Sequence, residues 1–390
     1  MGRANWGHTM NVPVRRLDFL DSIRAVAILL VLGFHAVGAS VGLDRLPWHG
    51  WFPDFSAQPA LLGLYPLTFG GVGVPIFFAV SGFCIHLSHR QSGESGFRAF
   101  YLRRAFRIYP PYLVALVLFA LFFPLTRLDL ATDAARWQLA AHAGLFHNLA
   151  SPWFFGINPS FWSIAAEAQL YLVYPLLLAL VRRFGWPGAL GLLAGIELGI
   201  RLLSGLWFLG QQDPLPRMLT DGPLAYWFSW AMGAHVAEMM VQGRKPALAK
   251  VPTIVWALAA LTCAHLKPLT PLTFPFVAVG TAMWISRRVG EPTTGGAPYG
   301  LRLFRSIGLW SYSIYLFHQP IITWVANKAR SLAPAGGDNP WVSLGAVSLT
   351  ILPLILLCGL AYRWLEVPAG QLGKCLAARV RHPSSTPTKS

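Results

Sequence analysis

Long apolar runs recur along almost the whole chain, and they constrain its fold more than any other feature. A helix needs about 20 apolar residues to cross a bilayer, because its backbone must satisfy its own hydrogen bonds there. Of the 390 residues, 55% are hydrophobic and only 12% are charged, a balance too apolar for a soluble domain of this length. We therefore predict an all-α, polytopic integral membrane protein.

The hydropathy pattern predicts about ten transmembrane helices. They are expected near 21–43, 68–88, 108–125, 164–181, 187–205, 224–242, 252–267, 271–288, 306–326 and 342–364. An even number puts both termini on one side, and the basic start of the chain (Arg3, Arg15, Arg16) puts that side in the cytoplasm. We expect a cytoplasmic segment at 1–15, a transmembrane domain at 16–368, and a basic, disordered cytoplasmic tail at 369–390.

The charge and the cysteines exclude other classes of protein. The net charge of +16 is explained by basic cytoplasmic loops and by attraction to anionic lipids, so we expect no nucleic-acid partner. The four cysteines show neither a metal-binding spacing nor a disulfide framework, and we expect no metal. The predicted location is the cell inner membrane.

Arg24 and His35 are the strongest candidates for function. Ionisable side chains are costly inside a bilayer unless they face a cavity or a partner. Eleven steps at 100° return almost to the starting direction, so both side chains lie on one helix face, roughly 16 Å apart along the axis. A buried imidazole that stays neutral is the usual general base near neutral pH. The alternative is that His35 bonds a neighbouring helix and Arg24 extends to the interface.

Two further charged groups stand out. The segment YLRRAFRIYPPY places Arg103, Arg104 and Arg107 within about one helical turn, just before the third expected span. Forked guanidinium donors suit phosphate oxygens, although such a cluster can also simply set the topology. Glu167 enters the fourth expected span, where its carboxylate can orient an imidazole, accept a hydroxyl or pair with an arginine.

Weaker signals accompany these groups. Trp162 suits either sugar stacking or interfacial anchoring, and Ser81 suits either a substrate site or close helix packing. His318 is a candidate for lining the same cavity. Glu197 and Arg201, four residues apart, are interpreted as a structural ion pair, whereas Glu238 and His235 remain without a role.

Together these segments resemble the membrane-bound acyltransferase family 3, bacterial enzymes that acylate surface glycans and some secreted small molecules. The resemblance rests on the Arg24 and His35 spacing and on FFAVSGF, RRAFRIYPPY, FWSIAAEAQLYLVYP, SYSIYLFHQP and YRWLEVP, in family order from residue 16 to about 368. It implies transfer of an acyl group, usually acetyl, from cytoplasmic acyl-coenzyme A to a hydroxyl acceptor. Acyl-coenzyme A is then a substrate, and no permanently bound cofactor is expected.

The resemblance also implies roles for the candidate residues. Arg104 and Arg107, with Arg24 and with Arg103 beside them, would hold coenzyme A, and His35 would deprotonate the acceptor hydroxyl. Glu167 matches the family's acidic position, although Ala168 stands where a second acid is frequent.

Three alternatives remain open at this point. A covalent acyl-serine step through Ser81 or Ser313 is less favoured, because no base is evident beside either. The acceptor is either an envelope saccharide or a secreted small molecule such as a macrolide. A transporter or flippase would also use buried Arg, His and Glu around a cavity.

Overall fold

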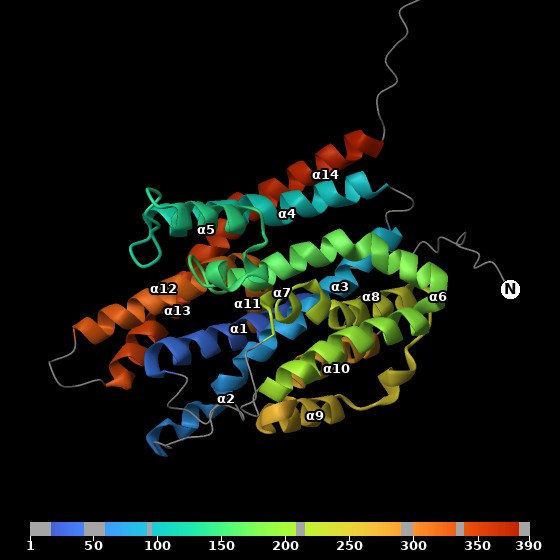
Figure 1. Ribbon diagram of the computed structural model, residues 1–390, viewed down its shortest axis with the longest axis horizontal. Coiled ribbons are helices and arrows are strands. Elements are labelled where there is room, and N and C mark those ends of the chain that lie inside the picture. Colours follow the sequence, from blue (N-terminus) through green and yellow to red (C-terminus); the bar gives the residue numbers. More distant parts are fainter. Residues whose placement is uncertain are drawn as a thin grey trace, which may run out of the picture.

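The computed structural model describes residues 17–42, 59–91, 96–207, 215–289, 299–332 and 339–381. Its regular elements within these ranges are helices without any strand, which confirms the predicted all-α class. The segment 1–15, predicted to be cytoplasmic, lies outside the described residues. The α-helices (Figure 1) are α1 (Asp18–Val41), α2 (Tyr65–Thr68), α3 (Gly73–Gln91), α4 (Phe97–Val117), α5 (Asp133–Ala143), α6 (Phe161–Trp207), α7 (Arg217–Thr220), α8 (Trp227–Val241), α9 (Thr253–His265), α10 (Thr273–Arg288), α11 (Tyr299–Leu309), α12 (Ser311–Ser331), α13 (Pro340–Ala361) and α14 (Val367–Arg381).

The axes of most long helices are roughly parallel or antiparallel, and these helices form a bundle (Figure 1). Six helical segments among the described residues are long and apolar enough to cross a bilayer, so the chain is a multi-pass membrane protein. They are Asp18–Val41, Leu61–Gln91, Phe97–Phe122, Phe161–Leu206, Pro268–Arg288 and Pro340–Val380. The predicted number of ten is not confirmed, because α8 has only 15 residues, α9 only 13, and α12 carries several polar side chains. The side on which the termini lie stays a prediction.

Helix α6 contains a sharp break. Its 47 residues would extend for about 70 Å as one straight helix, more than twice the thickness of the hydrocarbon core. Gly185 has φ 69° and ψ 171°. This conformation lies outside the helical region and is one that glycine adopts readily, and Pro187 follows two residues later. The two halves run in opposite directions on either side of this break (Figure 1). They correspond to the separate spans predicted at 164–181 and 187–205.

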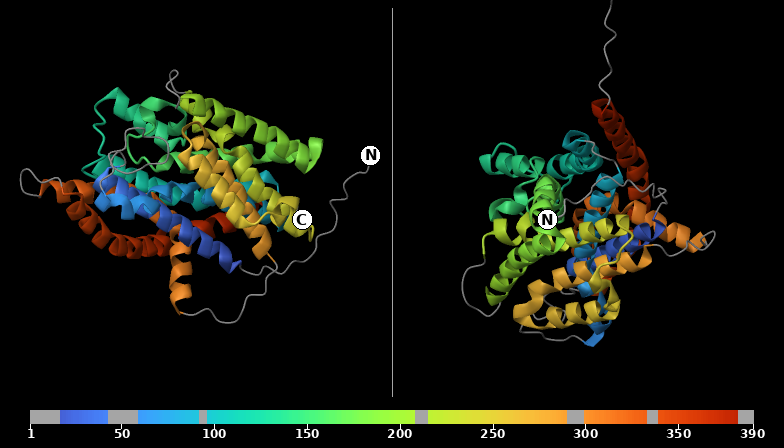
Figure 2. Two further views of the ribbon diagram at one scale, coloured as in Figure 1. Left: turned by 90° about the horizontal axis from the view of Figure 1, so that it is seen from below. Right: turned by 90° about the vertical axis from the view of Figure 1, so that its right-hand side faces the viewer.

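Two boundaries differ from the prediction. The expected span 306–326 is interrupted at Trp310, where α11 meets α12, and α11 stands across the bundle (Figure 2, left). The predicted disordered tail, 369–390, instead continues as α14 as far as Arg381, and residues 382–390 lie outside the described residues. Packing explains the second difference: α14 lies against α4, and a Cβ on Gly373 would be only 2.6 Å from Phe106 Cβ. Tertiary contact of this kind stabilises helices whose composition alone is polar.

Helices α3 and α8 cross with their backbones in contact. A Cβ on Gly82 would lie 2.0 Å from the carbonyl oxygen of Trp230, and one on Gly233 would lie 2.0 Å from that of Ala79. Only glycine fits at either position. The crossing fixes Ser81, the neighbour of Gly82, against α8.

Candidate active site

A cavity of about 310 Å³ lies between α1, α3, α4, α6 and α12, which is within the usual range for ligand sites. Arg24, Arg104, Arg107, Glu167 and Ser81 all line it. The structure therefore brings together five of the predicted site residues, which come from four separate helices. The other polar lining residues are Asp21, Ser163, Tyr171, Ser311, Tyr312 and Tyr315.

The three arginines point into this cavity from two facing helices. Arg104 and Arg107 are three residues apart on α4 and so share a face, while Arg24 comes from α1. The cluster was predicted to precede a span, but it lies inside α4, which begins at Phe97. Arg107 is exposed to the cavity, so its guanidinium can reach a ligand there. Arg103 does not line the cavity.

Glu366 provides negative charge beside the arginines. It interacts electrostatically with both Arg107 and Arg24. Its carboxylate accepts hydrogen bonds from the backbone N–H of Ser313, at 2.9 Å, and from the Ser313 hydroxyl. Glu366 ends a π-helical turn, Tyr362–Glu366, between α13 and α14, and such turns are frequent at functional sites. This acid belongs to the segment YRWLEVP, and its only signal in the sequence is a charge at the end of an apolar run.

A directed chain of hydrogen bonds crosses the cavity wall. Tyr171 donates its hydroxyl proton to Glu167 Oε1, at 2.6 Å. Because that proton is used, Ser81 Oγ, at 3.2 Å from the Tyr171 oxygen, must be the donor in the next bond. Ser81 in turn accepts from Trp230 Nε1, at 3.2 Å. Glu167 is thus connected to Ser81 through one tyrosine, a connection that the sequence did not indicate.

His35 does not line the cavity; it lies further along α1 than Arg24 and pairs with His318. The His318 Nε2 and His35 Nδ1 atoms are 2.9 Å apart. His318 Nδ1 is 2.9 Å from the carbonyl oxygen of Tyr315, which can only accept, so Nδ1 carries the proton. In uncharged rings, His318 Nε2 then accepts from His35 Nδ1, and His35 Nε2 keeps a free lone pair. The sequence placed both histidines near the site but did not pair them.

Tyr315 separates the cavity from this histidine pair. It lines the cavity, and its ring centroid is 5.4 Å from that of His318. Its hydroxyl is 2.7 Å from Ser163 Oγ, which also lines the cavity. Tyr315 therefore contacts both the cavity and the histidine pair.

Trp162 does not line the cavity. It packs among aromatic rings, with centroids 6.4 Å from Phe154 and 5.6 Å from Tyr226. The ring of Phe154 also contacts Arg217, whose guanidinium carbon is 4.0 Å from its centroid. This aromatic group therefore forms a separate cluster.

The remaining buried charges have structural partners. Glu197 and Arg201 form the predicted ion pair, at 3.1 Å, and Glu197 also accepts from the backbone N–H of Ser229, at 2.9 Å. Glu238 accepts from His86 Nε2, at 2.9 Å, and lies 3.1 Å from Arg90 Nε.

A pair of histidines lies outside the expected spans. The rings of His142, near the end of α5, and His147 are stacked with centroids 3.9 Å apart and planes within 8°. Both residues are fully buried. Burial lowers the pKa of His142 to about 4 and that of His147 to about 2, where the neighbouring His142 adds to the effect. Both rings are consequently uncharged near neutral pH.

A family described as an acyltransferase domain matches residues 17–362. The chain belongs to this acyltransferase family. It is therefore an enzyme that transfers acyl groups, and the transporter interpretation is set aside.

Several curated relatives share 23–26% identity with this acyltransferase. Peptidoglycan O-acetyltransferase OatA of Listeria monocytogenes is 25% identical over 91% of the chain and 56% of its own length. O-acetyltransferase OatA of Staphylococcus aureus is 23% identical over 92% of the chain and 58% of its own length. Acyltransferase MdmB of Streptomyces mycarofaciens is 26% identical over 92% of the chain and 93% of its own length. The chain thus spans little more than half of the OatA proteins, and no solved structure matches it.

Proposed function

We propose that this acyltransferase moves an acetyl group from acetyl-coenzyme A to a hydroxyl of a cell-envelope glycan. The convergence of Arg24, Arg104 and Arg107 on one cavity carries the proposal. Three guanidinium groups supply forked, permanently charged donors, which suit the phosphate oxygens of coenzyme A. The names of the OatA relatives, O-acetyltransferases of which one acts on peptidoglycan, support acetyl as the group and a glycan as the acceptor.

The arginines hold the nucleotide end of the donor, and the thioester extends toward His35. The distance suits this arrangement, because Arg24 and His35 are separated by roughly 16 Å along α1. Tyr315 lies on the route and limits which acyl groups can pass.

His35 acts as the general base in direct transfer. Its Nε2 takes the proton of the acceptor hydroxyl as the hydroxyl oxygen attacks the thioester carbonyl carbon. The carbon–sulfur bond then breaks, and the imidazolium returns the proton to the leaving thiolate, which gives free coenzyme A and the ester. His318 positions this base, because its Nε2 accepts from His35 Nδ1 and thereby directs the free lone pair to Nε2.

Glu167 assists without touching the thioester. Its carboxylate, held by the Tyr171 hydroxyl, interacts electrostatically with Arg107 and keeps that guanidinium in the cavity when no donor is bound. A Ser81 acyl-enzyme is the competing route, since its hydroxyl proton has a path through Tyr171 to Glu167.

The membrane arrangement follows from the donor. Acetyl-coenzyme A is cytoplasmic, and the cavity lining begins at the start of α1, with Leu17, Asp21 and Arg24. We therefore place this end of the bundle in the cytoplasm, with ten spans in the cell inner membrane and both termini inside.

Isotope transfer in envelopes tests the acceptor. Membranes from cells with and without the gene are supplied with acetyl-labelled acetyl-coenzyme A, and glycans, lipids and secreted small molecules are separated and analysed by mass spectrometry. We expect gene-dependent, alkali-labile label on an envelope glycan. Label confined to a secreted small molecule would overturn the glycan acceptor, and label left entirely on coenzyme A would overturn the transfer.

A further inference from the structure

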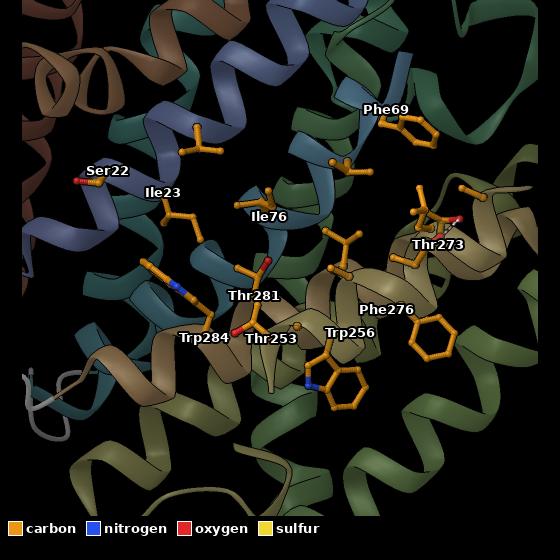
Figure 3. Close-up of a pocket in the computed structure, with 18 residues that line it drawn as sticks. Ser22, Ile23, Phe69, Ile76, Thr253, Trp256, Thr273, Phe276, Thr281 and Trp284 are labelled. Carbon is orange, nitrogen blue, oxygen red and sulfur yellow. Dashed lines mark hydrogen bonds between the residues drawn. The ribbon is translucent and has the colours of Figure 1, made fainter. Parts of the chain in front are cut away.

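A second, apolar hollow lies on the other side of α1 from the arginine cavity. This groove has a volume of about 520 Å³ and lies between α1, α3, α9 and α10 (Figure 3). Along α1, Ser22, Ile23 and Val26 line the groove, whereas Asp21 and Arg24 line the cavity. The two hollows are thus separated by one helix, and the groove takes no part in the site described above.

The groove opens toward lipid. Val26 of α1 and Leu261 of α9 line the groove and are also exposed, by 43% and 45%. Side chains of this kind are exposed in a membrane protein where the surface meets hydrocarbon. Water is therefore excluded from the groove entrance, and a hydrocarbon chain is the available occupant.

The two ends of the groove differ in the residues that lie beyond them. Ser22 and Trp284 lie toward one end, and Phe69, Thr273 and Phe276 toward the other (Figure 3). Along α10, the Trp284 end is followed by the basic residues Arg287 and Arg288.

Arg287 and Arg288 continue the groove-lining face of α10, because they follow Gly280 and Trp284 at helical spacing. Arg288 lies over the Trp284 ring, with its guanidinium carbon 5.5 Å from the centroid. Within the described part of the chain, the buried Nη2 of Arg287 has no hydrogen-bond acceptor. The groove thus has an apolar body and a cationic end.

The length of the groove matches the thickness of the hydrocarbon region of one leaflet. Thr273 and Trp284 line opposite ends of the α10 wall, and eleven steps at about 1.5 Å give roughly 16 Å. Half of a hydrocarbon core of about 30 Å is nearly the same distance. If the headgroup of a lipid lies at the Arg288 end, the groove can therefore contact its acyl chain through the whole thickness of that leaflet.

We propose that this groove binds one acyl chain of an anionic phospholipid, with the lipid phosphate against Arg287 and Arg288. Charge complementarity selects the headgroup, because arginines beside a membrane surface attract anionic lipids. The lipid occupies a specific site rather than the general annulus around the bundle.

Native mass spectrometry of the delipidated full chain tests this proposal. The protein is exposed to vesicles of phosphatidylglycerol or, separately, of phosphatidylcholine, and bound lipid is counted. We expect one tightly held phosphatidylglycerol per chain, a rise in the thermal midpoint with that lipid, and much weaker retention of phosphatidylcholine. Equal retention of the two lipids would overturn the anionic headgroup.

Two pairs of variants locate the lipid. Ala257→Trp fills the groove from an exposed position on α9, and Leu258→Trp places the same indole side chain on the same helix outside the groove lining. Arg288→Gln removes the charge at the groove end, and Arg183→Gln removes a similarly stacked arginine, 5.4 Å from the Phe184 ring, that is not part of the groove.

The expected result is loss of the retained lipid in Ala257→Trp and its persistence in Leu258→Trp. Preference for phosphatidylglycerol should disappear in Arg288→Gln and remain in Arg183→Gln. Retention of the lipid in folded Ala257→Trp, or its equal loss in both tryptophan variants, would place the bound lipid elsewhere and refute the proposal.

Discussion

Replacing Arg107 with alanine removes the guanidinium that is most open to the cavity. If this group binds a phosphate of coenzyme A, the variant loses charge-assisted hydrogen bonds worth about 1.5–3 kcal/mol. Since about 1.4 kcal/mol corresponds to a tenfold change, the dissociation constant for coenzyme A should rise by roughly 10-fold to 150-fold. Arg107→Lys should fall between, because it keeps the charge but loses the planar fork.

Isothermal titration of the purified protein in lipid nanodiscs with coenzyme A measures this change. Arg98→Ala is the matched control, because Arg98 is on the same helix but is exposed and does not line the cavity. It should bind like the wild type. Removal of Arg107 leaves the negative charge of Glu366 less compensated, so a melting curve must show that each variant is folded. Unchanged affinity in folded Arg107→Ala would refute the phosphate role.

Three other predictions concern separate parts of the fold. His318→Ala should slow acetyl transfer without raising the KM for acetyl-coenzyme A, and His318→Gln should restore part of the rate, because its amide oxygen can accept from His35 Nδ1; equal rates in both variants would contradict the positioning role. Glu197→Gln should lower stability by about 3–5 kcal/mol, since it leaves a buried arginine uncompensated, and a thermal midpoint equal to that of the wild type would argue against this. Below about pH 6.5, His142 and His147 bind protons in the unfolded chain but not in the folded chain. Their contribution to stability is therefore fully present above that pH. As the pH falls toward the lower pKa values of the folded chain, the free energy of unfolding decreases by roughly 1.4 kcal/mol per pH unit for each histidine. Thermal midpoints at neutral and mildly acidic pH should therefore diverge less in His147→Phe, and an equally steep loss in that variant would contradict the assignment.

The sequence predicted those parts of the site that depend on helical periodicity. Arg24 and His35 occupy one helix, and Arg104 and Arg107 share one face, because their spacing alone determines their relative direction. Hydropathy similarly predicted the helical class and the break that Gly185 introduces into α6. These features are local, so a single sequence contains them.

Features that depend on contacts between distant segments could not be predicted in the same way. The pairing of His318 with His35 requires the packing of α12 against α1, and the position of Glu366 requires a π-helical turn that no composition signals. Trp162 suited a substrate site by residue type, but its ring packs away from the cavity. Helix α14 depends on its contact with α4, so a polar composition alone wrongly suggested disorder over 369–381.

Release of free coenzyme A thiol by the purified protein tests the central claim most directly. Acetyl-coenzyme A is supplied with an envelope glycan acceptor, and thiol release is compared with ester formation in the wild type, in folded His35→Gln and in folded His89→Gln, a histidine of α3 outside the cavity lining. We predict equal amounts of thiol and ester in the wild type and in His89→Gln, and loss of both in His35→Gln. If folded His35→Gln released thiol and formed ester in equal amounts and as fast as the wild type, the assignment of His35 as the base would be contradicted.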